Sequence, residues 1–150
     1  MKMNADSNIM QQAKRASSIN LEQSKVASIL INKQALTNLN REQMREGLTS
    51  DGNPITPDYS RGYAWFKEKL SSYKAPPGTP DLFVTGAFQS DMTLVLRNGV
   101  EFTSSDPKTG KLVGRYGRKI FGIMSANMQQ ARQIVTNSYI MFVSRNLLKR

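Results

Sequence analysis

Apolar side chains recur every three or four positions in the first third of the chain, and this is helical spacing. The spacing is weak before Leu21 and regular after it, with no proline or glycine until Gly47. We therefore expect a long helix over residues 21–47 that ends at Gly47. Residues 1–20 are expected to form an N-terminal arm that is flexible or becomes helical on a partner.

The next part of the chain predicts a loop, a short helix and a second loop. Residues 49–57 are rich in turn formers and contain two prolines, which prevent a helix. Beyond them, apolar residues return with helical spacing and predict a short amphipathic helix that carries Trp65 and buries Tyr59, Tyr63, Phe66 and Leu70. The prolines of residues 75–80 predict an extended surface loop.

A β-hairpin is the clearest local prediction. Asn98-Gly99 separates two segments of alternating apolar and polar residues, 92–97 and 100–104. This dipeptide favours a type I′ turn, which needs positive φ at both central positions. Residues 112–116 follow as a third strand or an irregular segment, and a helix begins at Ser125 and continues close to the C-terminus.

Several turn and packing positions are expected to shape the region between these elements. Thr85 or the turn before it begins a single helical turn, and an aromatic-glycine pair precedes the last helix. The residues that we assign to packing and turns are Phe83, Thr85, Gly86, Phe88, Asn98, Gly99, Phe121 and Gly122.

The order of these elements predicts an α+β fold: a long N-terminal helix, a short helix, a small antiparallel sheet built on the Asn-Gly hairpin, and a C-terminal helix. The chain has 150 residues, which is enough for one hydrophobic core. We therefore expect one domain over residues 21–150 behind the arm of residues 1–20.

Composition narrows the possible functions. The chain has no cysteine and no histidine, so it lacks disulfides, the commonest metal ligands and the usual nucleophile and base pairs. We expect no enzyme activity, no cofactor and no metal. A carboxylate enzyme using Asp91 or Glu101 is the remaining catalytic hypothesis, and no signature in the sequence indicates it.

Positive charge is concentrated in the C-terminal part. The formal net charge is +10, and no carboxylate side chain follows Asp106. This distribution favours an anionic neighbour, either an acidic protein surface or nucleic acid, unless it is simply a solvated face. We assign Arg115, Arg118 and Lys119 to a basic patch that faces a partner. No apolar run is long enough to span a bilayer, so no membrane partner is expected.

Two short motifs carry a resemblance to a known group of proteins. They are Leu82-Phe83-Val84-Thr85-Gly86-Ala87-Phe88, and Tyr116-Gly117-Arg118-Lys119-Ile120-Phe121-Gly122-Ile123 before the last helix. With the order of elements, they make residues 35–150 resemble small head-tail connector, tail-completion and minor-tail (virion morphogenesis) proteins of tailed bacteriophages. The Leu-Arg that usually follows the Thr-Gly turn of those families is Phe88-Gln89 here.

The resemblance implies a virion structural protein of the neck or tail, assembled in the host cytoplasm. Its partners would be further copies in a ring of about twelve, the portal, and other neck or tail proteins, with DNA in the central channel. A basic nucleic-acid-binding module is the alternative, because Tyr116 lies beside Arg118 in a strongly basic segment.

Overall fold

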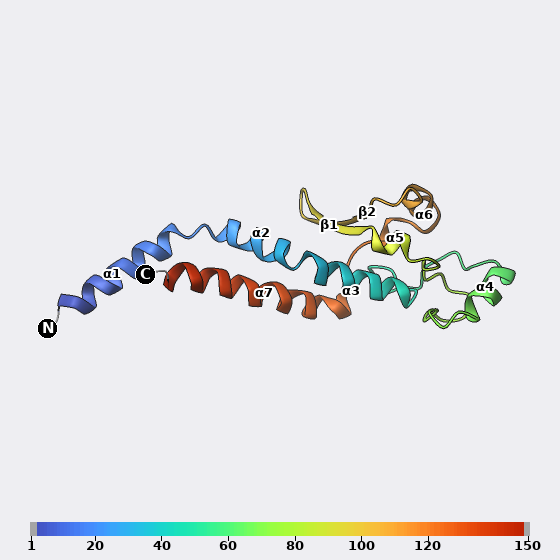
Figure 1. The fold of residues 1–150 in the computed structure, drawn as a ribbon, viewed down its shortest axis with the longest axis horizontal. Coiled ribbons are helices and arrows are strands. Elements are labelled where there is room, and N and C mark those ends of the chain that lie inside the picture. Colours follow the sequence, from blue (N-terminus) through green and yellow to red (C-terminus); the bar gives the residue numbers. More distant parts are fainter. Residues whose placement is uncertain (1–2, 149–150) are drawn as a thin grey trace. The chain divides into compact units, whose positions relative to one another are not determined.

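The computed structural model describes residues 3–148, with the side chains of residues 9–11 and 13–148. Residues 1–2 of the expected arm and the basic residues Lys149 and Arg150 lie outside the described part. The chain divides into two compact units. Figure 1 labels the helices and strands that compose them. Unit 1 consists of residues 1–32 and 132–150, and unit 2 consists of residues 33–131. The two units differ in which side chains they bury.

Unit 1 is helical. It contains α1 (Met3–Ser18), α2 (Leu21–Ile31) and residues 132–148 of α7 (Ser125–Leu148). The Asn20 side chain caps α2 by accepting a hydrogen bond from the backbone N–H of Gln23, at 3.0 Å. At the other end of α2, the Asn32 side chain donates to the hydroxyl of Ser138 at 2.7 Å and connects α2 to α7.

The long helix expected over residues 21–47 is divided into two helices at Asn32. Helix α2 ends at Ile31 and α3 (Lys33–Arg45) begins at Lys33. The Asn32 side chain also donates to the backbone carbonyl of Ser28 at 2.7 Å. Asparagine disfavours a helix interior because its side chain competes for backbone hydrogen bonds in this way.

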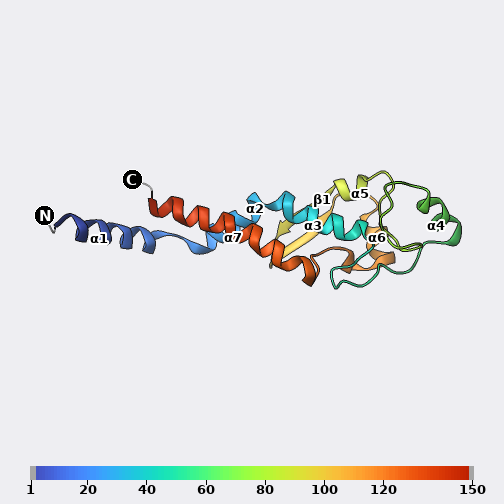
Figure 2. The ribbon, with the colours of Figure 1, turned by 90° about the horizontal axis from the view of Figure 1, so that it is seen from below.

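Unit 2 is a mixture of helices and a small sheet. After α3 come α4 (Arg61–Glu68), the single turn α5 (Ala87–Ser90), strands β1 (Met92–Leu96) and β2 (Val100–Ser104), α6 (Thr109–Tyr116), a 3₁₀ turn (Arg118–Ile120) and the start of α7. Strand β1 lies beside α3 (Figure 2). The C-terminal helix expected from Ser125 is confirmed.

The small antiparallel sheet is confirmed, with two strands. Leu94 lies opposite Phe102, and both side chains are buried. Leu96 pairs with Val100, so three residues form the turn where a two-residue turn was expected. Asn98 lacks the positive φ of a type I′ turn, and Gly99 has a φ of 153°. The strand pairing therefore does not depend on the turn type that the sequence predicts.

Residues 112–116, expected as a strand or an irregular segment, belong to helix α6. The carboxylate of Asp106 accepts a hydrogen bond from the N–H of Lys108 at 2.7 Å, just before the helix begins. Leu112, Val113 and Tyr116 have helical spacing, and all three pack against the core of unit 2. Helical periodicity explains these apolar positions, and the sheet has no third strand in residues 3–148.

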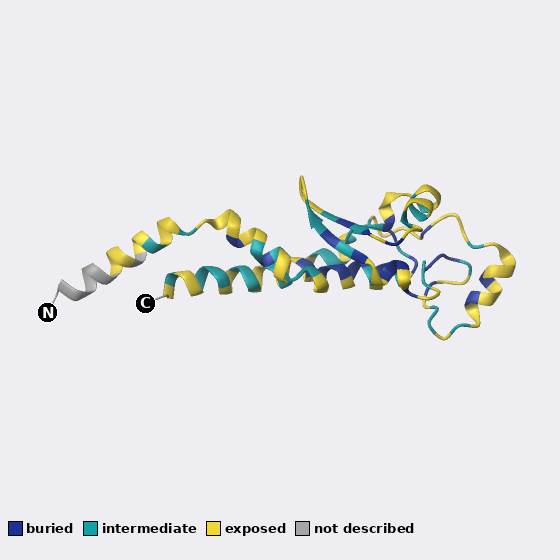
Figure 3. Ribbon diagram, turned by 45° about the horizontal axis from the view of Figure 1, so that its top comes forward, coloured by how far each residue is buried: buried dark blue, intermediate teal, exposed yellow. Residues whose placement is uncertain are grey.

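The core of unit 2 joins α3, α5, β1 and the segment before α7. Its buried cluster consists of Met44, Ile55, Phe88, Met92 and Ile120. Figure 3 shows the buried positions gathered on α3 and on the two strands. The aromatic rings of Phe88 and Phe121 pack against each other, with their centroids 6.0 Å apart.

Two buried amides of α3 hold the segment that precedes α7. The Asn40 side chain donates to the carbonyl of Ile120 and accepts from the N–H of Gly122, each at 3.1 Å. Gln43 similarly donates to the carbonyl of Gly122 at 3.2 Å and accepts from the N–H of Met124 at 2.8 Å. These four bonds satisfy backbone groups that no helix or strand pairs.

Candidate functional site

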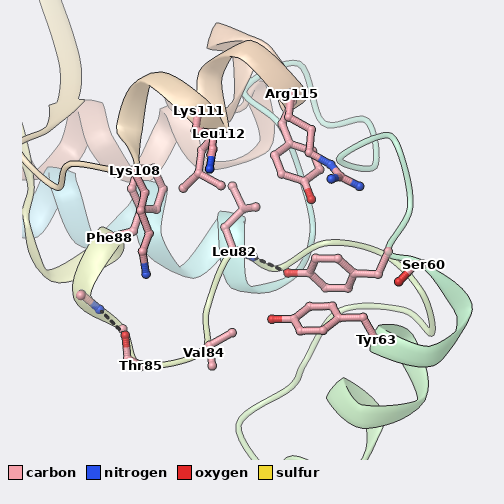
Figure 4. A pocket seen from close by; sticks show the side chains of 14 residues that line it. Ser60, Tyr63, Leu82, Val84, Thr85, Phe88, Lys108, Lys111, Leu112 and Arg115 are labelled. Atoms are coloured by element: carbon pink, nitrogen blue, oxygen red, sulfur yellow. Dashed lines mark hydrogen bonds between the residues drawn. The ribbon is translucent and has the colours of Figure 1, made fainter.

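A groove with a volume of about 690 Å³ opens in unit 2 between the start of α4, residues 82–88 and α6 (Figure 4). Leu82, Val84 and Phe88 contribute apolar surface from one side, and Leu112 contributes it from α6. Val84 is 50 % exposed, so part of this apolar surface is accessible. The groove can therefore receive an apolar group.

Helix α6 gives the groove a positively charged wall. Lys108, Lys111 and Arg115 all line the groove, at a spacing of three and four residues that places them on one face of the helix. Among the described residues, none that lines the groove carries a carboxylate. The groove therefore attracts an anion and has no acidic side chain that would compete for it.

The opposite wall is anchored by a buried carboxylate. Lys67 is 0 % exposed, and its ammonium group lies 2.8 and 2.9 Å from the two carboxylate oxygens of Asp81. Lys67 also donates to the carbonyl of Phe83. Asp81 accepts further hydrogen bonds from the Tyr59 hydroxyl at 3.0 Å and the N–H of Phe83 at 3.2 Å. A buried charge pair with this many partners fixes the position of the wall.

The backbone of this wall has an unusual conformation. Leu82 has a φ of 51°, in the left-handed region that side chains rarely adopt. Its N–H donates to the Tyr59 hydroxyl at 3.2 Å (Figure 4). The Asp81 network thus holds the backbone of Leu82 and Phe83, the two residues that follow Asp81 in this wall. Strain of this kind persists only where the surroundings enforce it, so the wall is preformed.

The tyrosines of the groove remain protonated at neutral pH. Burial and the adjacent Asp81 carboxylate raise the pKa of Tyr59 far above its usual value of 10.0. Burial, followed by Asp81, also raises the pKa of Tyr63. Burial raises the pKa of Tyr116 although the Arg115 guanidinium, 5.5 Å from its ring, acts in the opposite direction. These hydroxyls are hydrogen-bond donors, not anions.

The three cations assigned to a basic patch have different surroundings. Arg115 lines the groove with Lys108 and Lys111. Lys119 forms an ion pair with Asp51 at 2.6 Å, and its backbone carbonyl accepts from the N–H of Ser50 at 2.7 Å. Arg118 is exposed. The groove therefore shares only Arg115 with the patch that the sequence predicts.

The packing and turn positions lie mainly around the groove and the core. Phe83 is half-buried beneath the Arg45 guanidinium, 4.0 Å from its ring centroid. Thr85 lines the groove, and Gly86, the residue before α5, has a φ of 83°. A Cβ at Gly86 would approach the Phe83 ring to 2.9 Å, which explains a glycine there. The remaining positions are the core residues Phe88 and Phe121, the close-packed Gly122, and Asn98 and Gly99 at the exposed hairpin tip.

Unit 1 presents a second candidate surface, which we call the helical surface. Among its described side chains, those of residues 9–11, 13–32 and 132–148, only Ser24 and Ser28 are buried. Its large apolar side chains are exposed or half-buried, and the exposed ones are Ile9, Met10, Leu21, Val26, Leu30, Ile31, Ile140, Met141 and Leu148. Exposed apolar side chains in this number make the helical surface a candidate interaction surface.

Sequence reasoning missed the residues that build the groove. The sequence predicts that the short helix buries Phe66, yet Phe66 and Trp65 are exposed and Lys67 is buried. Nothing in the sequence pairs Lys67 with Asp81. The spacing of Lys108, Lys111 and Arg115 did carry a signal, because a helical conformation over residues 108–116 puts them on one face.

Comparison with known protein families, curated proteins and solved structures finds no match to this chain. None of the helices within residues 3–148 has the length and apolar character needed to cross a membrane. In the same residues, no group of three or more acidic side chains is arranged to hold a metal ion. The candidate surfaces are therefore interpreted from their own chemistry.

Proposed function

We propose that this chain is a non-enzymatic structural subunit of a bacteriophage virion, located in the neck or tail as a head-tail connector, adaptor or tail-completion protein. Copies would form a ring of about twelve around the DNA channel and bridge the portal to tail components. The observation that supports assembly is the helical surface of unit 1, which leaves its large apolar side chains accessible. The bacteriophage setting rests on the sequence resemblance.

The helical surface suits contact between copies. Apolar groups on α2, such as Val26 and Leu30, gain the free energy of burial only when another protein covers them. In a closed ring every subunit makes equivalent contacts with its two neighbours. A neighbour can therefore cover the helical surface of every copy. Homomeric interfaces are more apolar than transient ones, in agreement with the side chains present here.

Native mass spectrometry of the full chain tests this assembly. The variant Leu30→Gln with Met141→Gln removes apolar groups from unit 1 that are 48 and 64 % exposed. The matched control, Val100→Gln with Trp65→Gln, changes groups of unit 2 that are 47 and 65 % exposed. We expect the first pair alone to weaken oligomers, by about tenfold or more in dissociation constant. A monomer at all concentrations, also with portal protein present, contradicts the proposal.

Imaging of virions tests the location separately. The proposal expects density for this chain as a ring at the neck or tail, on the axis of the DNA channel. Virions that lack the chain, or that carry it only outside the neck and tail, contradict the bacteriophage role even if the isolated protein oligomerises.

A nucleic-acid-binding module is the second candidate, because Lys108, Lys111 and Arg115 form a continuous positive row. Neutralising three phosphates predicts that the logarithm of DNA affinity falls with the logarithm of salt concentration at a slope of about −3. A titration of a DNA duplex at several salt concentrations measures this slope. Binding that is this steep and is lost in Lys111→Gln favours the module, and no binding at low salt excludes it.

A further inference from the structure

The groove of unit 2 combines two features that are seldom adjacent. One wall carries the cations Lys108, Lys111 and Arg115, and the other carries the apolar side chains of Leu82 and Val84 (Figure 4). A small anion would use the first wall and leave the second without a contact. An apolar ligand without charge would leave the three cations without counter-charge. The best occupant therefore contains both an acidic group and an apolar group.

We infer that the groove docks a short segment of a partner protein, in which one apolar side chain inserts between Val84 and Leu112 and neighbouring carboxylates bind the cations of α6. This segment is extended or helical and enters from solvent, since the groove is open along one side. The inference adds the chemistry of a partner to the proposed function. It concerns unit 2 alone, so it holds or fails independently of assembly through unit 1.

Charge complementarity favours an acidic protein segment. The cations face no carboxylate among the described lining residues, and Asp81, behind the wall, is fully buried against Lys67. The field in the groove is therefore positive, and carboxylates of a partner are the protein groups that it selects. Arg115 can bind a carboxylate through two parallel hydrogen bonds. Such a pair fixes the orientation of the carboxylate in addition to attracting its charge.

The aromatic residues of the groove do not favour nucleic acid. The Tyr59 and Tyr63 rings pack edge to face at 4.7 Å, with an angle of 82° between their planes. Single-stranded nucleic acid needs accessible ring faces on which successive bases stack. Here one tyrosine covers the other, and the Tyr59 hydroxyl is already bonded to Asp81. The Tyr59–Tyr63 pair is thus a poor stacking platform for successive bases.

Preorganisation makes the groove suitable for a short peptide. The Asp81 network and the left-handed conformation of Leu82 set one wall before any ligand arrives. The other wall is the regular helix α6, whose apolar face is anchored in the core by Leu112 and Tyr116. A ligand then loses less free energy to ordering of the protein, which is how short segments reach useful affinity.

Fluorescence anisotropy with the full chain tests the inference. The probe is a labelled peptide of about 12 residues, with a central Leu-Phe pair and three glutamates on each side. One matched peptide replaces the glutamates by glutamine, and another replaces Leu-Phe by Gly-Ser. At about 0.1 M salt, we expect each matched peptide to bind at least about tenfold more weakly than the probe.

Variants of the chain assign the binding to the groove. Lys111→Gln with Arg115→Gln is expected to weaken the probe by about tenfold or more, because both cations line the groove. Lys74→Gln with Arg97→Gln removes the same charge from exposed positions outside it and is expected to change affinity less than about twofold. Val84→Ser should weaken the Leu-Phe probe and leave the Gly-Ser peptide unchanged, since only the apolar contact is lost.

Four results would overturn the inference. The first is no binding of the probe, and the second is equal binding of the Gly-Ser peptide, which would indicate attraction of an anion alone. The third is equal loss of affinity in the Lys74 and Arg97 control, which would indicate a response to net charge. The fourth is displacement of the probe by a single-stranded oligonucleotide of similar length at lower concentration, which would assign the groove to nucleic acid.

Discussion

Unit 2 buries a cluster of apolar residues, whereas the described side chains of unit 1 include no buried apolar residue. In unit 2, Met44, Ile55 and Ile120 are fully buried in one cluster. In the described side chains of unit 1, by contrast, the buried residues are Ser24 and Ser28, while Leu30 and Met141 face solvent. Burial of apolar area is the main favourable contribution to folding. Unit 2 therefore contains a buried core that stabilises it, whereas in the proposed assembly unit 1 would be completed by another protein.

The buried ion pair gives the largest expected effect within unit 2. Lys67→Met leaves the Asp81 carboxylate buried without its counter-charge, and we expect a loss of about 3–5 kcal/mol in the free energy of unfolding. Chemical denaturation followed by fluorescence measures it. The double variant with Asp81→Asn removes both charges and should recover part of the loss. A single variant as stable as the natural chain would show that the pair does not support the fold.

The amides of α3 give the next largest effect. Asn40→Ala removes the partner of the Ile120 carbonyl and of the Gly122 N–H, and we expect a loss of about 2–4 kcal/mol. Gln34→Ala is the control, because Gln34 is exposed on the same helix and should change stability by less than about 0.5 kcal/mol. Equal effects in the two variants would contradict the conclusion that the Asn40 amide holds the segment before α7.

A buried residue of unit 1 should matter much less. Ser28 is fully buried, but its hydroxyl bonds only to the backbone carbonyl of Ser24, one turn earlier, at 2.6 Å. Ser28→Ala loses this bond and gains helix propensity, so we expect a change within about 0.5 kcal/mol. Thermal unfolding of the full chain measures the difference. A loss as large as that of Asn40→Ala would mean that unit 1 has a specific core of its own.

The smallest effect concerns acid stability. The Lys119 ammonium and the Thr49 hydroxyl lower the pKa of Asp51 from 3.8 to about 2. A pKa lowered on folding contributes stability above the unfolded value, and this contribution disappears as the pH falls from about 4 to about 2. Lys119→Gln should therefore unfold at a slightly higher pH in an acid titration and match the natural chain at pH 1. An unchanged acid midpoint would show that this exposed pair adds nothing.

The sequence predicts the parts of the fold that depend on local signals. Helical spacing located the helix from Ser125, and alternation located the two strands. The break at Asn32 was missed because its side chain bonds to Ser138, which is distant in sequence. Residues 112–116 were misassigned because their apolar residues were interpreted as strand or irregular positions and not as one face of a helix. Local sequence patterns thus indicated where helices and strands lie, but not where the expected long helix is interrupted.

The candidate site was less predictable, because it depends on contacts between distant residues. Lys67 and Asp81 are polar residues that a sequence pattern assigns to the surface, yet together they form the best-buried charges of the described chain. Arg115 was expected beside Arg118 and Lys119, but the turn of α6 groups it with Lys108 and Lys111. Only tertiary structure shows which cations share a surface.

Hydrogen exchange of the full chain, measured at low and high protein concentration, tests the central claim most directly. The account predicts that the amides of unit 2 are protected at both concentrations, whereas those of α2 and residues 132–148 exchange rapidly in the monomer and slow by at least about tenfold on assembly. Equal protection of the two units in a dilute monomer would contradict it, because unit 1 would then be stable without a partner.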